Sequence, residues 1–413
     1  MNPIIRWWVT PYLPKNHIFL EEGKEPKGRI ALFQIYFKKW IVHPIKRRLA
    51  KGYLILIRTI FHTKVIGITG SAGKTTTKDM LTSILKKSGR VISSYKNIDP
   101  IYNIPDTILK ISPRTKYLVL EMGVEFPGEM DYYLWLAKPD IGLITNIFPT
   151  HTEFFKSTKG VFEEKSKLLH VLTNLDTAIL NYENPSLKNI VNQLQVKTIL
   201  YGKGSDIFAN KILLGDNFIT NFQLNLRDKK IDIHLPIVGE QFVENALAST
   251  AVAYSLGVDT GSIKEGLECY VTPEHRMKII HLKNGAVLLD DSYNSNPEAA
   301  KRTISTFNKI AKRKTKIIVF GDMLELGTKE KKYHRNLGNY ILKKGVDYLI
   351  GVGLLSKETV RIVGEKIGKN KVFWFADNNG VAEVIEKIMD KNTLILVKGS
   401  RGIGLDKVVN KLS

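Results

Sequence analysis

Short apolar runs alternate with helical patterns of apolar residues through most of the chain. Uninterrupted apolar runs are typical of strands buried in a parallel sheet, and apolar residues three or four positions apart are typical of helices. Before residue 271 the runs fall at 65–68, 116–123, 140–146, 178–181 and 198–201, and helical patterns begin at 74, 160 and 244. Alternation of apolar and polar residues over 211–235 predicts antiparallel strands.

The same arrangement starts again after a boundary near residue 271. Strand-like runs at 286–290, 316–320, 348–351, 372–375 and 393–397 are separated by helical patterns at 297–312, 332–344, 356–366 and 380–390. This order predicts a second doubly wound α/β unit, similar to a Rossmann domain. The sequence therefore predicts an α/β protein with an extension at 1–63, a central domain at 64–271 and a C-terminal domain at 272–413.

The extension is basic and aromatic. Residues 1–64 carry 13 Lys and Arg against three Glu, so +10 of the net charge of +22 lies there. Lysines and arginines interrupt the apolar residues between 30 and 61, so no uncharged run reaches the ~18–20 residues of a membrane span. A signal peptide is not expected either, because no compact apolar core precedes a small-residue cleavage site.

Two interpretations of the extension remain open. In the first, a soluble helical extension packs its tryptophan and phenylalanine side chains on the next domain. In the second, an interfacial helix makes peripheral contact with the inner face of the membrane. The charge indicates an anionic partner, for which we expect a polyphosphate substrate or a lipid surface and not nucleic acid.

The single cysteine, Cys269, bears on the compartment. One cysteine excludes a disulfide framework and a cysteine-based zinc site, and it fits the reducing cytoplasm. We expect Cys269 to be a small buried apolar residue.

The strongest chemical signal is a loop of small residues between a predicted strand and a helix that opens with a lysine and threonines. These residues are Gly70, Ser71, Ala72, Gly73, Lys74, Thr75 and Thr76. Such a loop directs backbone N–H groups at phosphates, while the lysine reaches the β- and γ-phosphates and the first threonine can ligate Mg²⁺. Ile68 occupies the position of the first P-loop glycine, so the general motif is only partly met. We predict a P-loop ATPase domain.

Seven motifs, standing at or near predicted strand ends, make the chain resemble the Mur ligase family. They are TGSAGKTT at 69–76, EMG at 121–123, TN at 145–146 followed by His151, NALA at 245–248, DSYNSNP at 291–297, GDMLELG at 321–327 and KGSR at 398–401. The resemblance runs from about residue 64 to the C-terminus. The stretches at 291–297 and 321–327 are most similar to the branch that adds D-alanyl-D-alanine.

The resemblance implies a cytoplasmic, monomeric, ATP- and Mg²⁺-dependent amide ligase of cell-wall synthesis. In this family a substrate carboxylate attacks the γ-phosphate of ATP, and an amine then displaces phosphate from the acyl phosphate. The expected reaction adds D-alanyl-D-alanine, or a similar amine, to a muramyl-peptide precursor linked to a nucleotide sugar.

The resemblance also implies roles for single residues. Lys74 would hold the β- and γ-phosphates, and Thr75 and Glu121 would bind the Mg²⁺ that bridges them. His151 and Lys165 would hold a second Mg²⁺, with Lys165 carbamylated by CO₂. Neighbouring Lys167 is the competing choice for the modified lysine.

Further residues would contact the nucleotide and the amine. The nucleotide contacts implied by the resemblance are Asn245, Arg276, Tyr293 and Asn294. Lys398 and Arg401 would meet the carboxylate of the incoming amine, or they belong to an ordinary charged loop. Asp322 and Glu325 would orient the amine, or they cap the next helix.

Two departures from the family bear on the substrate. The glycine turn before Asn245 reads GEQFV at 239–243, where the family usually has His-Asn, and the family's N-terminal UDP-binding domain is not recognisable in residues 1–64. Three hypotheses result: a ligase for a UDP-linked muramyl peptide, a ligase for a different or lipid-linked acceptor at the membrane surface, and an ATP-binding partner protein without activity.

Overall fold

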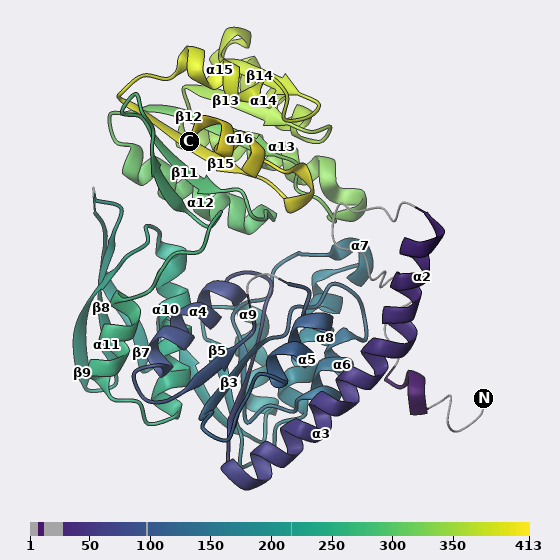
Figure 1. Ribbon diagram of the computed structural model, residues 1–413. Coiled ribbons are helices and arrows are strands. Elements are labelled where there is room, and N and C mark those ends of the chain that lie inside the picture. The colour runs from purple at the N-terminus through teal and green to yellow at the C-terminus, as the bar shows by residue number, and fades with distance from the viewer. Residues whose placement is uncertain (1–6, 12–27, 96–97, 216) are drawn as a thin grey trace. The chain divides into compact units, whose positions relative to one another are not determined.

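The computed structural model describes residues 7–11, 28–95, 98–215 and 217–413. The chain forms two compact units that are interleaved in sequence. The first comprises residues 1–147, 159–208 and 245–266, and the second comprises 148–158, 209–244 and 267–413. The prediction of an α/β fold is confirmed, and the division at residues 63 and 271 stays a prediction (Figure 1).

The first unit is built on a six-stranded parallel sheet of order β2-β3-β1-β4-β5-β6. Its strands are β1 (Lys64–Thr69), β2 (Val91–Ser93), β3 (Tyr117–Glu121), β4 (Ile141–Ile144), β5 (Thr177–Asn181) and β6 (Lys197–Tyr201). The helices that fall wholly or largely in this unit are α4 (Lys74–Leu85), α5 (Pro100–Ile108), α6 (Glu129–Leu136), α8 (Thr158–His170), α9 (Pro185–Ile190), α10 (Glu240–Ser255) and α11 (Thr260–Glu268). Because β1 lies between β3 and β4, their carboxyl ends meet at the loop that follows β1.

A long helix precedes β1. It consists of α2 (Arg29–Phe37), a π-helical turn (Lys38–Val42) and α3 (His43–Phe61), which follow one another without a break. One face of α3 contacts α5 and α6 on the outside of the first unit (Figure 1). No helix among the described residues is long and apolar enough to cross a membrane.

The second unit contains a six-stranded sheet of order β10-β11-β15-β12-β13-β14, parallel except for the antiparallel edge strand β10. Its strands are β10 (Lys278–His281), β11 (Val287–Asp291), β12 (Thr315–Gly321), β13 (Tyr348–Val352), β14 (Val372–Phe375) and β15 (Thr393–Lys398). Its helices are α7 (Thr152–Phe155), α12 (Pro297–Ala311), α13 (Glu330–Lys344), α14 (Ser356–Ile367), α15 (Val381–Ile388) and α16 (Asp406–Leu412). A sheet of β7 (Ile207–Leu214), β8 (Thr220–Leu226) and β9 (Lys229–Leu235) includes the predicted antiparallel pair.

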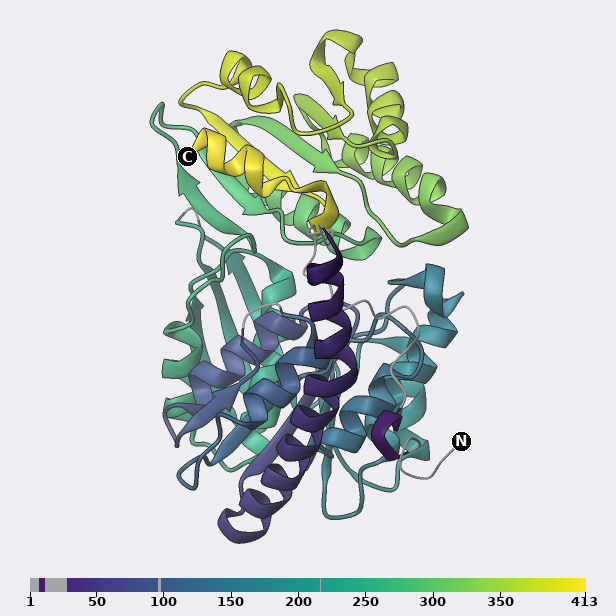
Figure 2. The ribbon, with the colours of Figure 1, turned by 45° about the vertical axis from the view of Figure 1, so that its right-hand side comes forward.

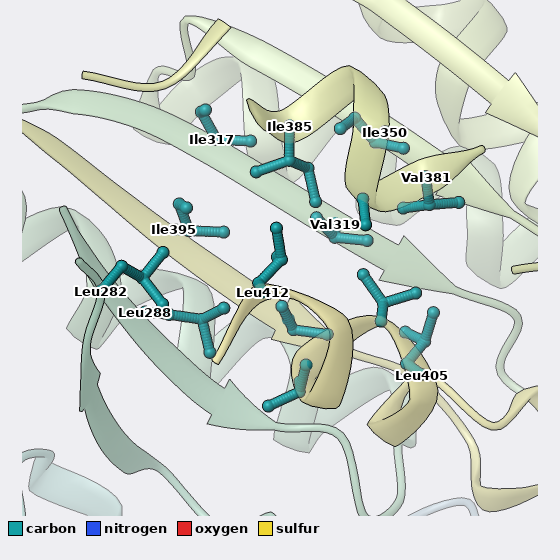
Figure 3. Packing of buried hydrophobic residues seen from close by; sticks show 14 of the residues in the cluster. Leu282, Leu288, Ile317, Val319, Ile350, Val381, Ile385, Ile395, Leu405 and Leu412 are labelled. Carbon is teal, nitrogen blue, oxygen red and sulfur yellow. The ribbon is translucent and has the colours of Figure 1, made fainter. Parts of the chain in front are cut away.

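The core of the C-terminal sheet shows why these sequences form these elements. Ile317, Val319 and Ile395 come from adjacent strands and pack against Val381 and Ile385 of α15 (Figure 3). All of these side chains are buried, as expected for strands covered on both faces. Their burial fixes the carboxyl ends of the strands, where the candidate site residues of this unit lie.

One local expectation is wrong. Cys269, which we expected to be a buried apolar residue, is exposed. It lies just after α11, where the helix ends and its neighbours Leu267 and Tyr270 take the buried positions.

Candidate functional site

The loop after β1 has the backbone geometry of a phosphate-binding loop. Gly70 and Gly73 have φ angles of 147° and 79°, which glycine adopts readily. A Cβ atom on Gly70 would lie 1.9 Å from Oγ1 of Thr145, and one on Gly73 would lie 2.3 Å from Oδ1 of Asn245. Both positions therefore require glycine, because side chains after β4 and in α10 fill the space.

Asn146 holds the loop in place. The Ser71 N–H donates to the Asn146 backbone carbonyl at 2.9 Å, and the Ala72 N–H donates to its side-chain oxygen at 2.8 Å. The Asn146 side-chain amide in turn donates to the Ala72 carbonyl at 3.1 Å. The segment after β4 thus positions the small residues that the sequence had singled out.

Lys74 begins α4 and folds back over this loop. Its Nζ atom donates to the Gly70 carbonyl at 3.0 Å. The first turn of a helix directs N–H groups out of its N-terminus and favours an anion there. Thr75 and Thr76 occupy that turn and are buried.

Glu121 ends β3 beside this turn. Thr75 donates its hydroxyl to Oε1 of Glu121 at 2.9 Å. The other oxygen, Oε2, is buried and accepts no hydrogen bond from the residues that the structure describes. The ammonium of Lys78 lies 4.0 Å from it, beyond hydrogen-bond distance. The pair of Thr75 and Glu121 therefore fits a Mg²⁺ ion, which prefers oxygen ligands.

Lys78 is a residue of this site that the sequence reasoning missed. Its side chain is buried, its Nζ atom lies 4.0 Å from Oε2 of Glu121, and it donates to the Ser94 carbonyl at 2.8 Å. Ser94 also accepts the Glu121 N–H through its hydroxyl at 3.1 Å. The available signal was its position four residues after Lys74, which places both lysines on one side of α4.

The two candidate lysines of α8 have different surroundings. Lys165 is 1% exposed, and burial lowers its pKa well below the usual value, with Lys74 acting in the same direction. Lys167 instead forms ion pairs with Asp131 at 2.7 Å and Glu164 at 2.8 Å. Burial therefore disfavours the charged form of Lys165, whereas the ion pairs of Lys167 favour its charged form.

His151 belongs to the second unit, at the start of α7. It has a φ angle of 51°, and its Nδ1 atom is hydrogen-bonded to the carboxylate of Glu325, whose φ angle is 62°. That hydrogen bond holds the pKa of Glu325 below its usual value. Among the described residues, no three His, Cys, Asp or Glu side chains gather into a metal site.

A cluster of predicted residues lies at the carboxyl ends of β11 and β15. The ring of Tyr293 lies 4.4 Å from the guanidinium of Arg276 and 5.9 Å from that of Arg401. Lys398 is buried, donates to the Asn294 carbonyl at 3.1 Å and is paired with Asp291 at 2.6 Å. The structure therefore brings together Arg276, Tyr293, Asn294, Lys398 and Arg401.

Asp322 serves the backbone of the second unit. Its carboxylate accepts the N–H groups of Leu355 at 3.1 Å and Ser356 at 2.6 Å, where α14 begins. Asp322 therefore caps a helix, as one of the two alternatives predicts, but the capped helix is α14 and not the next helix, α13. Contact of Asp322 with an amine substrate stays a prediction.

Comparison with known protein families and structures identifies both halves of this arrangement. Residues 68–253 match the Mur ligase middle domain, and residues 275–401 match the Mur ligase glutamate ligase domain. Among solved structures, MurF from Acinetobacter baumannii has a TM-score of 0.79 at 27% identity and covers 89% of this chain and 80% of its own. MurF from Thermotoga maritima, solved with ADP, has a TM-score of 0.78 at 26% identity and covers 90% of this chain and 83% of its own.

Curated relatives are similar over nearly the same span. A UDP-N-acetylmuramoyl-tripeptide–D-alanyl-D-alanine ligase of Buchnera aphidicola is 32% identical over 406 residues, which are 96% of this chain and 87% of the relative. The corresponding ligase of Bacillus subtilis is 31% identical, over 89% of this chain and 78% of the relative. Because these matches extend across both α/β units, the chain belongs to the Mur ligase family.

Proposed function

We propose that this protein is an ATP-dependent ligase that adds D-alanyl-D-alanine to UDP-N-acetylmuramoyl-tripeptide in peptidoglycan synthesis. The relatives that match most of the chain carry this name. The observation that carries the proposal is the junction of Lys74, Thr75 and Glu121 at the carboxyl ends of β1 and β3. Such a site can bring an anionic nucleotide and a carboxylate together, because it offers cations and helix N–H groups.

We further propose that Thr75 and Glu121 hold Mg²⁺. The buried Oε2 atom of Glu121 supports this assignment, because it accepts no hydrogen bond from the described residues and has the Lys78 ammonium only at 4.0 Å. When bound, the ion would neutralise the charge on the β- and γ-phosphates. Lys74 would bind the same phosphates from the other side of the loop.

Lys165 is proposed as the carbamylated lysine. Its burial and lowered pKa support this, because they favour the neutral nitrogen, which is the form that attacks CO₂ and then loses a proton. The resulting carbamate would be an anion able to hold a second Mg²⁺ together with His151. The ion-paired ammonium of Lys167 is less suited to this reaction.

The nucleotide contacts of Asn245, Arg276, Tyr293 and Asn294 are likewise proposals. The guanidinium of Arg276 beside the Tyr293 ring supports a phosphate- or base-binding role for the pair. Arg401, which is exposed, is better placed to meet a substrate carboxylate than Lys398, whose charge is paired with Asp291. We propose that the enzyme acts as a cytoplasmic monomer.

Phosphate release tests the proposal. We expect ATP-dependent release with UDP-N-acetylmuramoyl-tripeptide and D-alanyl-D-alanine together, and none when either is omitted. Lys74→Ala should abolish it. Turnover with other acceptors but not with this pair would contradict the proposal. No observation favours a lipid-linked acceptor, and membership of a ligase family speaks against a partner protein without activity.

A further inference from the structure

The helix that precedes β1 presents an apolar face to solvent. We call residues 29–61, which comprise α2, the π-helical turn and α3, the helical arm. Figure 2 shows it as one dark purple rod along the outside of the first unit. The residues of α3 that are buried against the unit are His43, Pro44, Arg47, Ala50, Leu54 and Ile57. On the opposite side, Leu49 and Leu56 are 61% and 53% exposed.

This exposed face continues along the whole arm. Its large apolar members are Ile30, Phe33, Phe37, Ile41, Ile45, Leu49, Leu56 and Ile60. They recur every three or four residues, with Gly52 filling the one gap, and α2 has no buried residue at all. In an uninterrupted α-helix, Phe33 and Phe37 would be turned by roughly a third of a turn from Ile45 and Leu49. The π-helical turn takes in about one extra residue and restores the alignment.

The charges of the arm have one sign. Residues 29–61 contain eight Lys and Arg and no Asp or Glu. Lys46 and Arg58 are ion-paired with Asp106 and Asp140 of the same unit. Arg47 is buried on the attached face and donates to the carbonyls of Trp8 and Pro11. Arg29 and Lys38 are exposed, as are the aromatic side chains of Tyr36 and Trp40.

We propose that this face of the helical arm binds the surface of a bilayer that contains anionic lipids. An apolar face flanked by cations and aromatic rings is what an interfacial helix requires. A second copy of the chain would bring two acid-free basic arms together, which repel. A nucleic acid would contact the cations but leave the isoleucines and leucines in water.

Flotation of the full-length protein with vesicles tests this proposal. We expect binding to vesicles of equimolar phosphatidylcholine and phosphatidylglycerol, and much weaker binding to phosphatidylcholine alone. The double variant Leu49→Glu, Leu56→Glu should lower the partition coefficient by about tenfold or more. The matched control is Leu175→Glu, Leu354→Glu, at sites 90% and 76% exposed outside the arm, and it should bind like the wild type.

A second variant separates the electrostatic part. Lys38→Gln, Lys39→Gln should weaken binding to the anionic vesicles by roughly fivefold for each lysine, and should not alter the weak binding to phosphatidylcholine. Since α2 and the π-helical turn have no buried residue, this variant should fold even if the glutamate variant does not. Absence of wild-type binding to anionic vesicles, or equal loss in the control, would overturn the proposal. So would a wild-type dimer in light scattering that the arm variant converts to a monomer.

Discussion

Lys165 and Lys167 lie two residues apart on α8, yet one is buried with a lowered pKa and the other is ion-paired. A buried lysine with a lowered pKa reduces native stability at neutral pH, because the unfolded chain binds the proton more strongly than the folded chain does. This cost disappears as the pH rises past the usual lysine pKa of 10.5. Such a residue is tolerated where function requires it.

Lys165→Met should therefore raise the melting temperature at pH 7 in CO₂-depleted buffer, and its advantage should shrink as the pH approaches 10.5. Activity should fall by about 100-fold, the upper end of the range for altered metal sites. Lys165→Ala should regain part of its activity with small carboxylates such as formate. Thermal denaturation and phosphate release measure these effects, and a fully active Lys165→Ala enzyme without added carboxylate would refute the assigned role.

Lys78 should act by positioning Glu121. Its Nζ atom is 4.0 Å from Oε2 of that carboxylate and is held there by the hydrogen bond to the Ser94 carbonyl. Lys78→Met should raise the Mg²⁺ concentration for half-maximal activity by about 10–100-fold, as for other residues that support a metal ligand. Lys86→Met, at the exposed end of the same helix, is the control. An unchanged Mg²⁺ dependence with reduced turnover would assign Lys78 a different role.

The buried imidazole of His334 should make the stability of the second unit sensitive to acid. Its Nε2 atom accepts the Met323 N–H at 3.0 Å, and burial lowers its pKa below 6.5. The folded state therefore binds fewer protons than the unfolded state, and stability falls as the pH drops below 6.5. His334→Gln should lose about 1–3 kcal/mol at pH 7.5. The difference from the wild type should narrow at pH 5 in urea titrations, and a constant difference would exclude this residue as the cause.

At the scale of elements, α11 and α4 approach so closely that their contact depends on glycine. A Cβ atom on Gly266 would lie 2.4 Å from the Cα atom of Ile84. This obstacle is backbone, so it cannot be relieved by a rotamer change. Gly52 in α3 is the opposite case, because no other part of the described chain comes within 4 Å of its Cβ position.

Gly266→Ala should destabilise the first unit by roughly 1–3 kcal/mol through overpacking. Gly52→Ala should instead stabilise the protein by about 0.5–1 kcal/mol, because alanine costs less entropy in a helix. Denaturant titration measures both. The same sign for the two variants would show that helix propensity, and not the approach of α11 to α4, decides the outcome at residue 266.

At the scale of the whole molecule, the strands of the two large sheets were predictable from the sequence, whereas the short elements and the burial of single polar side chains were not. Runs of buried apolar residues give parallel strands a strong signal, and every predicted strand of the two large sheets is present. The short elements β2, α7 and α9 have too few residues to show a period. The buried position of Lys78 could not be predicted, because a lysine side chain is usually solvated. Its burial depends on the hydrogen bond from its ammonium to the Ser94 carbonyl, which comes from another part of the chain.

Some residues of the candidate site could likewise be predicted from the sequence, and others could not. The glycines and Lys74 were recognisable because a loop motif is contiguous in sequence. The pairing of Lys398 with Asp291 and the capping of α14 by Asp322 depend on residues that are distant in sequence. Such contacts are set by strand order, which periodicity does not encode.

The π-helical turn at Lys38–Val42 makes the number of residues in the arm as important as their chemistry. Insertion of one more residue after Ile41 would exceed what the π-helical turn takes in, and all side chains before it would rotate by about 100° relative to those after it. Deletion of Ile41 should instead let the segment relax into a regular α-helix with the two halves of the face still aligned. Charge is the same in both cases, yet only the insertion points the phenylalanines of the front half in another direction. One added residue at this point would thus detach the molecule from a surface while leaving its chemistry intact.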